Sequence, residues 1–322
     1  MIEIPPNAPK VSVVLTTYRR AHILGETIES ILRQTYQDFE LLIQDDCSPD
    51  DTETVGRFYE KRDPRVRYRR TRKNVGMPEN LNEGIQASRG EYVANLHDGD
   101  IFDPTLLEKW SAALDAYPNA AFVFNAYRGL DNNGEVVQLC REPLGPCVSG
   151  HALLEQIYFR RWMFNSPVWG TVMGRRAAYL KAGLFDPRFG FVADVDMWMR
   201  LAEDYDVAYI PEPLIGLPTN EALPKSWTGV AAAASMRMQI EQMFLEARRR
   251  FYRGRRARLL LELMKHRLFI AMARSYWFAC GVKARIPGAR ALSLHRWWQK
   301  RGVAKAGASV EEASSLTKRA GT

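Results

Sequence analysis

The sequence is poor in cysteine, and the few cysteines form no recognisable site. Their spacing matches neither a zinc site nor a redox-active pair. The four are Cys47, Cys140, Cys147 and Cys280. Cys140 and Cys147 would pair only in an oxidising compartment. A disulfide-stapled secreted domain is therefore excluded.

Long apolar runs are also lacking. A membrane-spanning helix needs roughly 18 uncharged apolar residues. The nearest stretch, residues 267–282, is interrupted by Arg274. No secretory leader precedes the first apolar run, so we expect a reducing, cytoplasmic setting.

Charge divides the 322 residues into two zones. Residues 1–225 carry 25 Lys and Arg against 32 Asp and Glu, whereas residues 226–322 carry 20 against 5, which gives the net charge of +8. The hydrophobic content of 46% is enough for a sizeable core. We expect a folded domain over 1–225, a basic helical extension over 226–304 and a disordered tail over 305–322.

Strand-like and helix-like segments alternate through the first half of the chain, which is typical of an α/β fold with a largely parallel sheet. Strands are predicted at 10–18, 39–46, 66–70, 91–96 and 120–127, helices at 21–34, 78–88 and 104–116, and a hairpin turn at 131–134. Ligands bind at the carboxyl ends of such strands. The polar clusters "TTYRR", "DDCSPDD" and "HDGD", which each follow a strand, are therefore expected on one rim.

The cluster "HDGD" places Asp98 and Asp100 on either side of Gly99 directly after an apolar run. Two like charges at a strand end repel each other and need compensation. Carboxylate oxygens suit Mg²⁺ or Mn²⁺, and a diphosphate would fill the remaining positions of such an ion. The competing interpretation is an ordinary surface turn.

Taken together, the clusters resemble a known family. "PKVSVVLTTYRR", "SILRQTYQDFELLIQDDCSPDDT", "NVGMPENLNEGIQASRGEY", "HDGD" and "FDPRFGFVADVDMWMRLAEDYDVAYIPEPL" are similar, in order and spacing, to the motifs of family 2 glycosyltransferases. The resemblance covers about residues 9 to 215. It implies a GT-A fold, Rossmann-like with flanking helices, together with a nucleotide-sugar donor, a Mn²⁺ or Mg²⁺ cofactor and inversion at the anomeric carbon.

The resemblance also implies roles for single residues. The nucleotide-binding part would span about 9–127 and the acceptor and catalytic part about 128–225. Thr16 and Tyr18 match residues that line the base and ribose pocket, and Asp46 matches the residue that accepts a hydrogen bond from the base, uracil by preference. Asn74 and Gly76 match a loop that closes over the nucleotide.

The acidic motif departs from the family pattern, Asp-x-Asp-Asp. Aligned on the downstream "IFDP", its first acid falls on His97 and its third position on Gly99. Aligned on acid spacing, Asp98 and Asp100 are the metal pair, with Asp98 also at the nucleotide. We prefer the second alignment, with His97 as a further possible ligand.

Asp194 matches the catalytic base of the family, although the glutamate that often precedes it is Ala193 here. A hydroxyl nucleophile needs such a base at neutral pH. The alternative for Asp194 is a helix N-terminal acid favoured by the dipole. Asp196 lies four residues before Arg200, so a helix ion pair explains it.

Aromatic residues near the base are candidates for the acceptor platform. Trp162, Phe164 and Trp169 either form this platform or belong to the core, and Trp169 and Trp198 are the residues proposed to contact the acceptor. No histidine follows the base region, so its usual contact is absent or supplied by another residue such as Lys225.

The basic extension interleaves arginines with Leu, Phe, Met and Trp, which favours an anionic membrane surface over nucleic acid as partner. We expect a protein peripheral to the inner membrane face that acts on a glycan or lipid-linked acceptor, by resemblance in bacterial surface polysaccharide assembly. Ser293 replaces the glutamine of the processive synthases' Gln-x-x-Arg-Trp motif, so single-sugar transfer is expected. The alternatives are a catalytically silent GT-A scaffold and a nucleotidyltransferase, although no glycine- and lysine-rich loop suits a nucleoside triphosphate.

Overall fold

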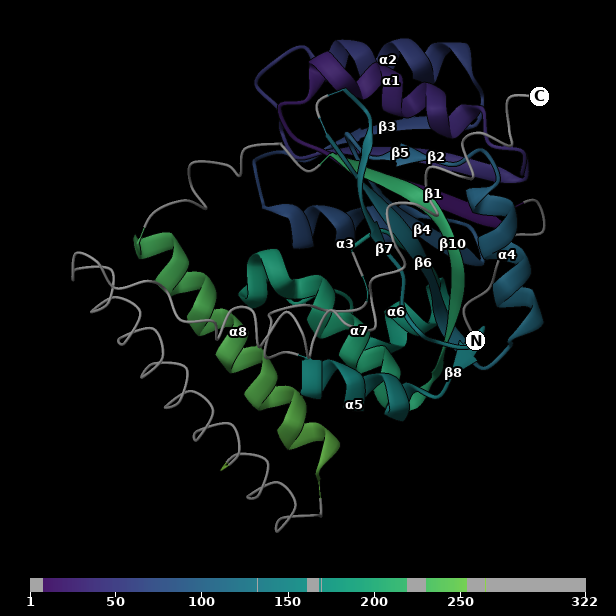
Figure 1. Ribbon diagram of the computed structural model, residues 1–322. Coiled ribbons are helices and arrows are strands. Elements are labelled where there is room, and N and C mark those ends of the chain that lie inside the picture. The colour runs from purple at the N-terminus through teal and green to yellow at the C-terminus, as the bar shows by residue number, and fades with distance from the viewer. Residues whose placement is uncertain are drawn as a thin grey trace, which may run out of the picture. The chain divides into compact units, whose positions relative to one another are not determined.

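The first predicted strand is β1 (Val11–Thr17), and all seven of its side chains are buried. The computed structural model describes residues 8–131, 133–160, 168, 170–218, 230–253 and 264 (Figure 1). β1 pairs with β2 on one side and β4 on the other, and a core cluster covers each of its two faces, so it has no solvated face.

Ten strands form one sheet in the order β3-β2-β1-β4-β9-β6-β10-β5, with β7 paired to β6 and β8 to β10. The strands after β1 are β2 (Phe39–Asp45), β3 (Val66–Arg70), β4 (Tyr92–His97), β5 (Ile101–Phe102), β6 (Ala120–Leu130), β7 (Val136–Cys140), β8 (Cys147–Val148), β9 (Val172–Arg175) and β10 (Asp206–Pro218). The block β3-β2-β1-β4 is parallel, as expected. Beyond it, β9 runs antiparallel between β4 and β6, a pairing that the sequence did not indicate.

Helices cover both faces of the sheet. They are α1 (Ala21–Leu32), α2 (Thr52–Arg62), α3 (Met77–Ala87), α4 (Leu106–Ala116), α5 (Gly150–Arg160), α6 (Arg176–Ala182), the 3₁₀ segment η2 (Pro187–Val192), α7 (Ala193–Asp204) and α8 (Val230–Phe251). The apolar residues of α1 and α4 pack in one core cluster, and those of α3, α5, α6, α7 and α8 pack in the other.

Most of the predicted elements are confirmed, including the hairpin that joins β6 to β7. Helix α2 was not predicted, because its sequence has little apolar periodicity and it buries only Thr52 and Gly56.

Cys47, Cys140 and Cys147 are free thiols.

The first compact unit of the chain ends at Arg253, because α8 buries Met243, Phe244 and Ala247 against the core. The predicted boundary between the folded domain and the basic helical extension at Lys225 stays a prediction. The rest of the basic extension and the tail, apart from Met264, lie outside the described residues. In the part of the chain that is described, no helix is long and apolar enough to cross a bilayer.

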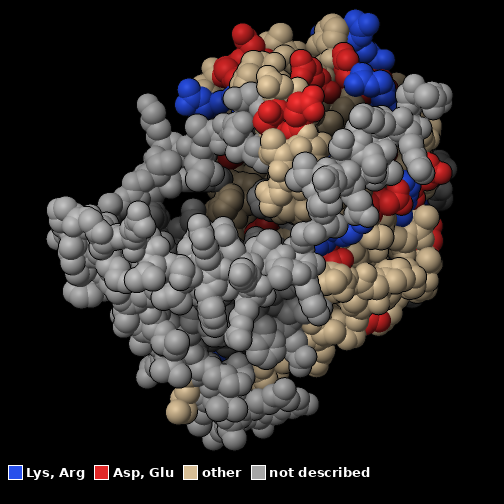
Figure 2. All heavy atoms as spheres, viewed as in Figure 1, with Lys and Arg blue, Asp and Glu red and all other residues tan. Residues whose placement is uncertain are grey.

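Charged side chains of both signs cover the end of the molecule that carries α1 and α2 (Figure 2). On α2, Arg57 contacts Glu53 and Glu60, and on α1 Arg33 contacts Glu29. Exposed pairs of this kind contribute little to stability. This end of the molecule is therefore a solvated surface.

Candidate functional site

The polar segments at the ends of β1, β2 and β4 line one cleft of about 750 Å³, as the sequence predicted. Its size is that of a small-molecule site. Eight of the predicted residues line it, namely Thr16, Tyr18, Asp46, Asn74, Gly76, His97, Asp98 and Asp100. Parallel strands bring these side chains together because their carboxyl ends meet at one edge of the sheet.

Tyr18 follows the end of β1 and lies on the cleft wall with 43% of its surface exposed. The next residue, Arg19, has a left-handed backbone (φ +59°), and its N–H donates to Ser48 Oγ at 2.9 Å. A non-glycine residue in this region carries backbone strain of a kind that clusters at functional sites. The turn leaves the ring of Tyr18 available to a planar ligand.

Asp46 holds the predicted nucleotide loop in place. Its carboxylate accepts hydrogen bonds from the N–H groups of Val75 at 2.7 Å and Gly76 at 2.9 Å. Asn74 Nδ2 donates to the backbone carbonyl of Asp46 at 3.4 Å. Thr71 Oγ1 also donates to Oδ1, at 3.3 Å, so the acceptor capacity that remains on this carboxylate lies mainly on Oδ2.

Its neighbour Asp45 is purely structural. This carboxylate is fully buried and accepts hydrogen bonds from Tyr68 Oη at 2.6 Å and from the Ser48 N–H at 3.0 Å. Of the two acids at the end of β2, only Asp46 lines the cleft.

The acidic turn after β4 is compensated from within the chain. Arg20 Nε lies 3.7 Å from Asp98 Oδ1, and Thr171 Oγ1 donates to Asp100 Oδ2 at 3.0 Å. Gly99 between them has φ +88°, a conformation that favours glycine. The repulsion expected from the sequence is thus reduced before any ligand arrives.

The donor set of this turn fits a hard divalent cation. Mg²⁺ is commonly held by one or two carboxylates together with substrate phosphates, and Asp98 and Asp100 supply two carboxylates at the cleft. Burial lowers the pKa of His97 to about 4, so its imidazole is neutral and able to act as a ligand near pH 7. Among the described residues no group of three or more His, Cys, Asp or Glu forms a metal cage by itself.

Asp194 lies in the first turn of α7. Its side chain and that of His97 both lie next to Gly170. A Cβ placed on Gly170 would lie 3.4 Å from Asp194 Oδ2 and 3.5 Å from His97 Nε2. Burial raises the pKa of Asp194 to about 6, although the Val195 N–H donates to its Oδ1 at 2.7 Å and opposes the rise. A carboxylate with such a pKa is a stronger base than an exposed aspartate.

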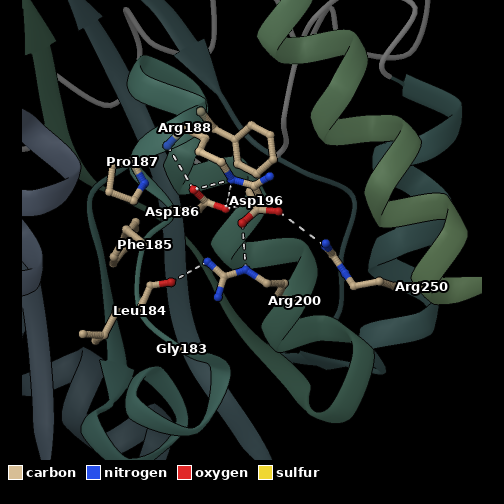
Figure 3. Close-up of a pocket in the computed structure, with 10 residues that line it drawn as sticks. Gly183, Leu184, Phe185, Asp186, Pro187, Arg188, Asp196, Arg200 and Arg250 are labelled. Atoms are coloured by element: carbon tan, nitrogen blue, oxygen red, sulfur yellow. Dashed lines mark hydrogen bonds and ion pairs between the residues drawn. The ribbon is translucent and has the colours of Figure 1, made fainter.

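Asp196 is only 1% exposed and forms the expected pair with Arg200, at 2.7 Å (Figure 3). Arg250 from α8 approaches its other oxygen at 3.4 Å. Arg200 also donates to the backbone carbonyls of Ala182 and Leu184. These contacts join α7 and α8 to the segment before η2 beside a separate pocket of about 290 Å³.

The structure corrects the role predicted for Trp198. Its side chain is fully buried and packs on Phe122 and Phe185, with ring centroids 5.0 and 5.7 Å away. It belongs to the core, so it is not an acceptor platform. Trp162, Phe164, Trp169 and Lys225 lie outside the described residues.

The cleft also contains residues that the sequence did not single out, two of which carry an aromatic ring or a charge. Phe191 in η2 lines the cleft and is 43% exposed. Arg20 beside Asp98 is the other. The sequence signals for them were the pair "RR" after β1, which contains Arg20, and "GF" before Asp194, which contains Phe191. A sequence cannot show which side chains point into the cleft.

The chain is similar to several known proteins. The model of a family described as "Glycosyl transferase family 2" matches residues 12–182. The chain is 28% identical over 201 residues to the putative colanic acid biosynthesis glycosyl transferase WcaA of Escherichia coli (strain K12), with 62% of this chain and 68% of WcaA covered. In eight curated relatives, the match corresponds to between 13% and 70% of the relative's length.

Two solved structures show a similar fold. TarS 1-349 of S. aureus, in complex with UDP-GlcNAc, superposes with a TM-score of 0.59 at 19% identity, over 74% of this chain and 66% of TarS. The mannosyltransferase PcManGT of Pyrobaculum calidifontis, in complex with GDP-Man and Mn²⁺, gives a TM-score of 0.54 at 16% identity, over 76% of this chain and 65% of that protein.

Proposed function

This chain belongs to glycosyl transferase family 2 and is a glycosyltransferase with a GT-A fold; from that premise we propose that it moves one sugar from a nucleotide-diphosphate sugar to an acceptor hydroxyl, with inversion at the anomeric carbon. One observation carries the proposal. The cleft gathers Tyr18, Asp46, His97 and the 98–100 acids, and Asp194, a buried carboxylate of raised pKa, lies behind His97 at Gly170.

The donor nucleotide is proposed to occupy the part of the cleft next to β1 and β2. Tyr18 offers an exposed ring to the base, Thr16 lines the ribose side, and Asp46 accepts from a base N–H while it holds the loop at Asn74. A uridine base is favoured, in line with the UDP-GlcNAc bound by TarS. Asp46 suits it because uracil presents an imide N–H to a carboxylate.

The diphosphate is proposed to lie at the acidic turn. Asp98 and Asp100 would hold Mn²⁺ or Mg²⁺, with the neutral His97 as a further candidate ligand. When bound, the cation supplies positive charge against the diphosphate as it leaves. Arg20 adds a second positive charge beside Asp98, and Gly99 leaves room for a phosphate to approach.

Asp194 is proposed as the general base. It accepts the proton of the acceptor hydroxyl while the oxygen attacks the anomeric carbon, and the bond to the diphosphate breaks on the opposite side. A single carboxylate is enough for this one-step displacement with inversion, and a second one acting as nucleophile is not required. Phe191 lies on the cleft wall close in sequence to Asp194, where a sugar ring would stack.

The acceptor is proposed to be a glycan or a lipid-linked sugar in bacterial surface polysaccharide synthesis, in line with the colanic acid pathway named for WcaA. The protein would work at the cytoplasmic face of the membrane, held there by the basic residues after Lys225. The same composition makes nucleic acid the less favoured partner.

The test is a nucleotide-release assay over a panel of UDP-, GDP- and dTDP-sugars, each with Mn²⁺, Mg²⁺ or EDTA. We expect release from one donor, loss of that release in EDTA, and a fall of at least 100-fold in Asp98→Asn. The matched control is Asp51→Asn, which changes an exposed acid at the start of α2. Failure of every donor both to be hydrolysed and to bind in calorimetry would contradict the proposal and favour a silent scaffold.

A further inference from the structure

Four strands bring one row of side chains to the same face of the sheet beyond the cleft. The register aligns Ile101 of β5 with Gly216 of β10, Gly216 with Arg128 of β6, and Arg128 with Leu139 of β7. Residues paired across a sheet point to the same face. The row therefore consists of Ile101, Gly216, Arg128 and Leu139.

A second row lies beyond a β-bulge, where the β6–β7 register shifts between Gly129 and Leu130. Pro218 pairs with Leu130, two residues beyond Arg128, and Leu130 pairs with Val136. A Cβ on Gly216 would lie 2.7 Å from Leu130 Cδ1 and 3.5 Å from Ile101 Cβ. Leu130 thus lies over Gly216 and joins the two rows into one apolar surface.

This surface, here named the apolar patch, comprises Ile101, Leu130, Val136 and Leu139. Three of the four are exposed, with 51% of Ile101, 49% of Val136 and 49% of Leu139 open to solvent. Single exposed apolar residues need no explanation, but contiguous ones mark a binding surface.

The apolar patch is continuous with the cleft. Ile101 directly follows Asp100, and Pro218, the partner of Leu130, lines the cleft. A molecule that lay along the patch would reach the acidic turn and the base without leaving the protein surface.

Arg128 gives the patch a polar centre. Its Nε is buried and makes no hydrogen bond within the described part of the chain. Buried guanidinium N–H groups are normally satisfied, and their planar geometry suits the oxygens of a phosphate. An apolar surface with one arginine in its middle row matches a ligand that carries both an apolar chain and a phosphate.

We propose that the apolar patch binds the hydrocarbon chain of a lipid-phosphate-linked acceptor, with Arg128 on the phosphate, so that the sugar attached to the phosphate enters the cleft. This inference rests on the proposed function, because it names the acceptor class of the same site. The chain of the lipid lies across β7, and the reacting hydroxyl is directed toward Asp194.

The probe is farnesyl phosphate, compared with farnesol and with inorganic phosphate, titrated by calorimetry into the full-length chain. We expect farnesyl phosphate to bind at least tenfold more tightly than either part alone. Leu139→Glu, which places a charge on the patch, should weaken that binding at least tenfold. Arg128→Gln should weaken farnesyl phosphate severalfold and leave farnesol unchanged.

Phe58→Glu is the matched control, because Phe58 is 48% exposed on α2, away from the patch residues in the sheet. It should bind farnesyl phosphate as the wild type does. Equal binding in Leu139→Glu and in a second variant, Val136→Glu, would overturn the proposal, provided that their melting temperatures match the wild type.

Other occupants of the patch predict different results. A wild-type dimer that Leu139→Glu converts to a monomer in size-exclusion chromatography would make the patch an interface between copies. Equal binding to phosphatidylcholine vesicles with and without farnesyl phosphate would make it a bilayer contact. Both results would overturn the proposal. Titration of the same samples with UDP-sugars tests the donor site separately, so failure of the proposed function is distinguishable.

Discussion

Asp194 and His97 both lie beside Gly170, within 3.5 Å of the point where a side chain would begin, although the three lie far apart in the sequence. A Cβ at Gly170 would meet His97 Cε1 at 2.8 Å and Asp194 Oδ2 at 3.4 Å. The absence of a side chain at Gly170 therefore sets how closely the end of β4 and the start of α7 approach each other. Asn95 Nδ2 fixes the glycine itself through a hydrogen bond of 2.9 Å to its carbonyl.

The first prediction is that Gly170→Ala lowers the rate of sugar transfer or donor hydrolysis by roughly 10- to 100-fold. The added methyl displaces His97 or Asp194, and small displacements of catalytic groups are costly. Overpacking also lowers the free energy of unfolding by about 1–3 kcal/mol. Gly145→Ala is the control, because a Cβ there meets nothing closer than 3.9 Å. Equal rates in the two variants would contradict this geometry.

The second prediction concerns pH. Burial raises the pKa of Asp194 to about 6, and a general base works only when it is ionised. kcat/KM should therefore fall about tenfold per pH unit below about 6 and level off above it. The profile is measured at constant ionic strength, with nucleotide affinity followed separately by calorimetry. A rate that stays constant down to pH 5 would argue against Asp194 as the base.

The third prediction concerns stability. Because the pKa of Asp194 is higher in the folded state than in the unfolded chain, its ionisation opposes folding above about pH 6 and has no effect below about pH 4. Asp194→Asn should then raise the free energy of unfolding at pH 7 by up to about 3 kcal/mol, and the gain should vanish near pH 4. Urea unfolding at both pH values measures this. A variant less stable than the wild type at pH 7 would contradict it.

Asp196 should behave in the opposite way, although it lies only two residues further along α7. Its buried carboxylate neutralises Arg200 and contacts Arg250 of α8. Removing one partner of a buried ion pair leaves the other uncompensated. We expect Asp196→Ala to lose about 3–5 kcal/mol of unfolding free energy, measured by urea unfolding. A loss below about 1 kcal/mol would mean that the pair is solvated.

The sequence predicted which segments form the site because the site lies at strand ends. Thr16, Asp46 and Asp98 each follow a buried run, and parallel strands place such residues on one rim. The Asp196–Arg200 pair was predictable for a similar reason, since helical spacing alone brings residues four apart together.

Contacts between distant segments could not be predicted from local pattern. Arg20 reaches Asp98 across 78 positions, and Gly170 separates two residues that no spacing rule relates. Trp198 shows the limit of helical spacing. It follows Asp194 by four residues on α7, but α7 buries Trp198 in the core, and no residue of this helix lines the cleft. Helical spacing predicts which face of a helix a residue lies on. How deeply its side chain is buried depends on the segments that pack against that face.

The most direct test of the account is the rate of nucleotide release by Asp194→Asn, relative to the wild type, at saturating donor and pH 7.5. The account predicts a rate at least 1,000-fold lower with a donor Kd within threefold of the wild type, because Asp194 takes a proton and does not hold the nucleotide. A variant that keeps more than a tenth of the wild-type rate would show that another group is the base.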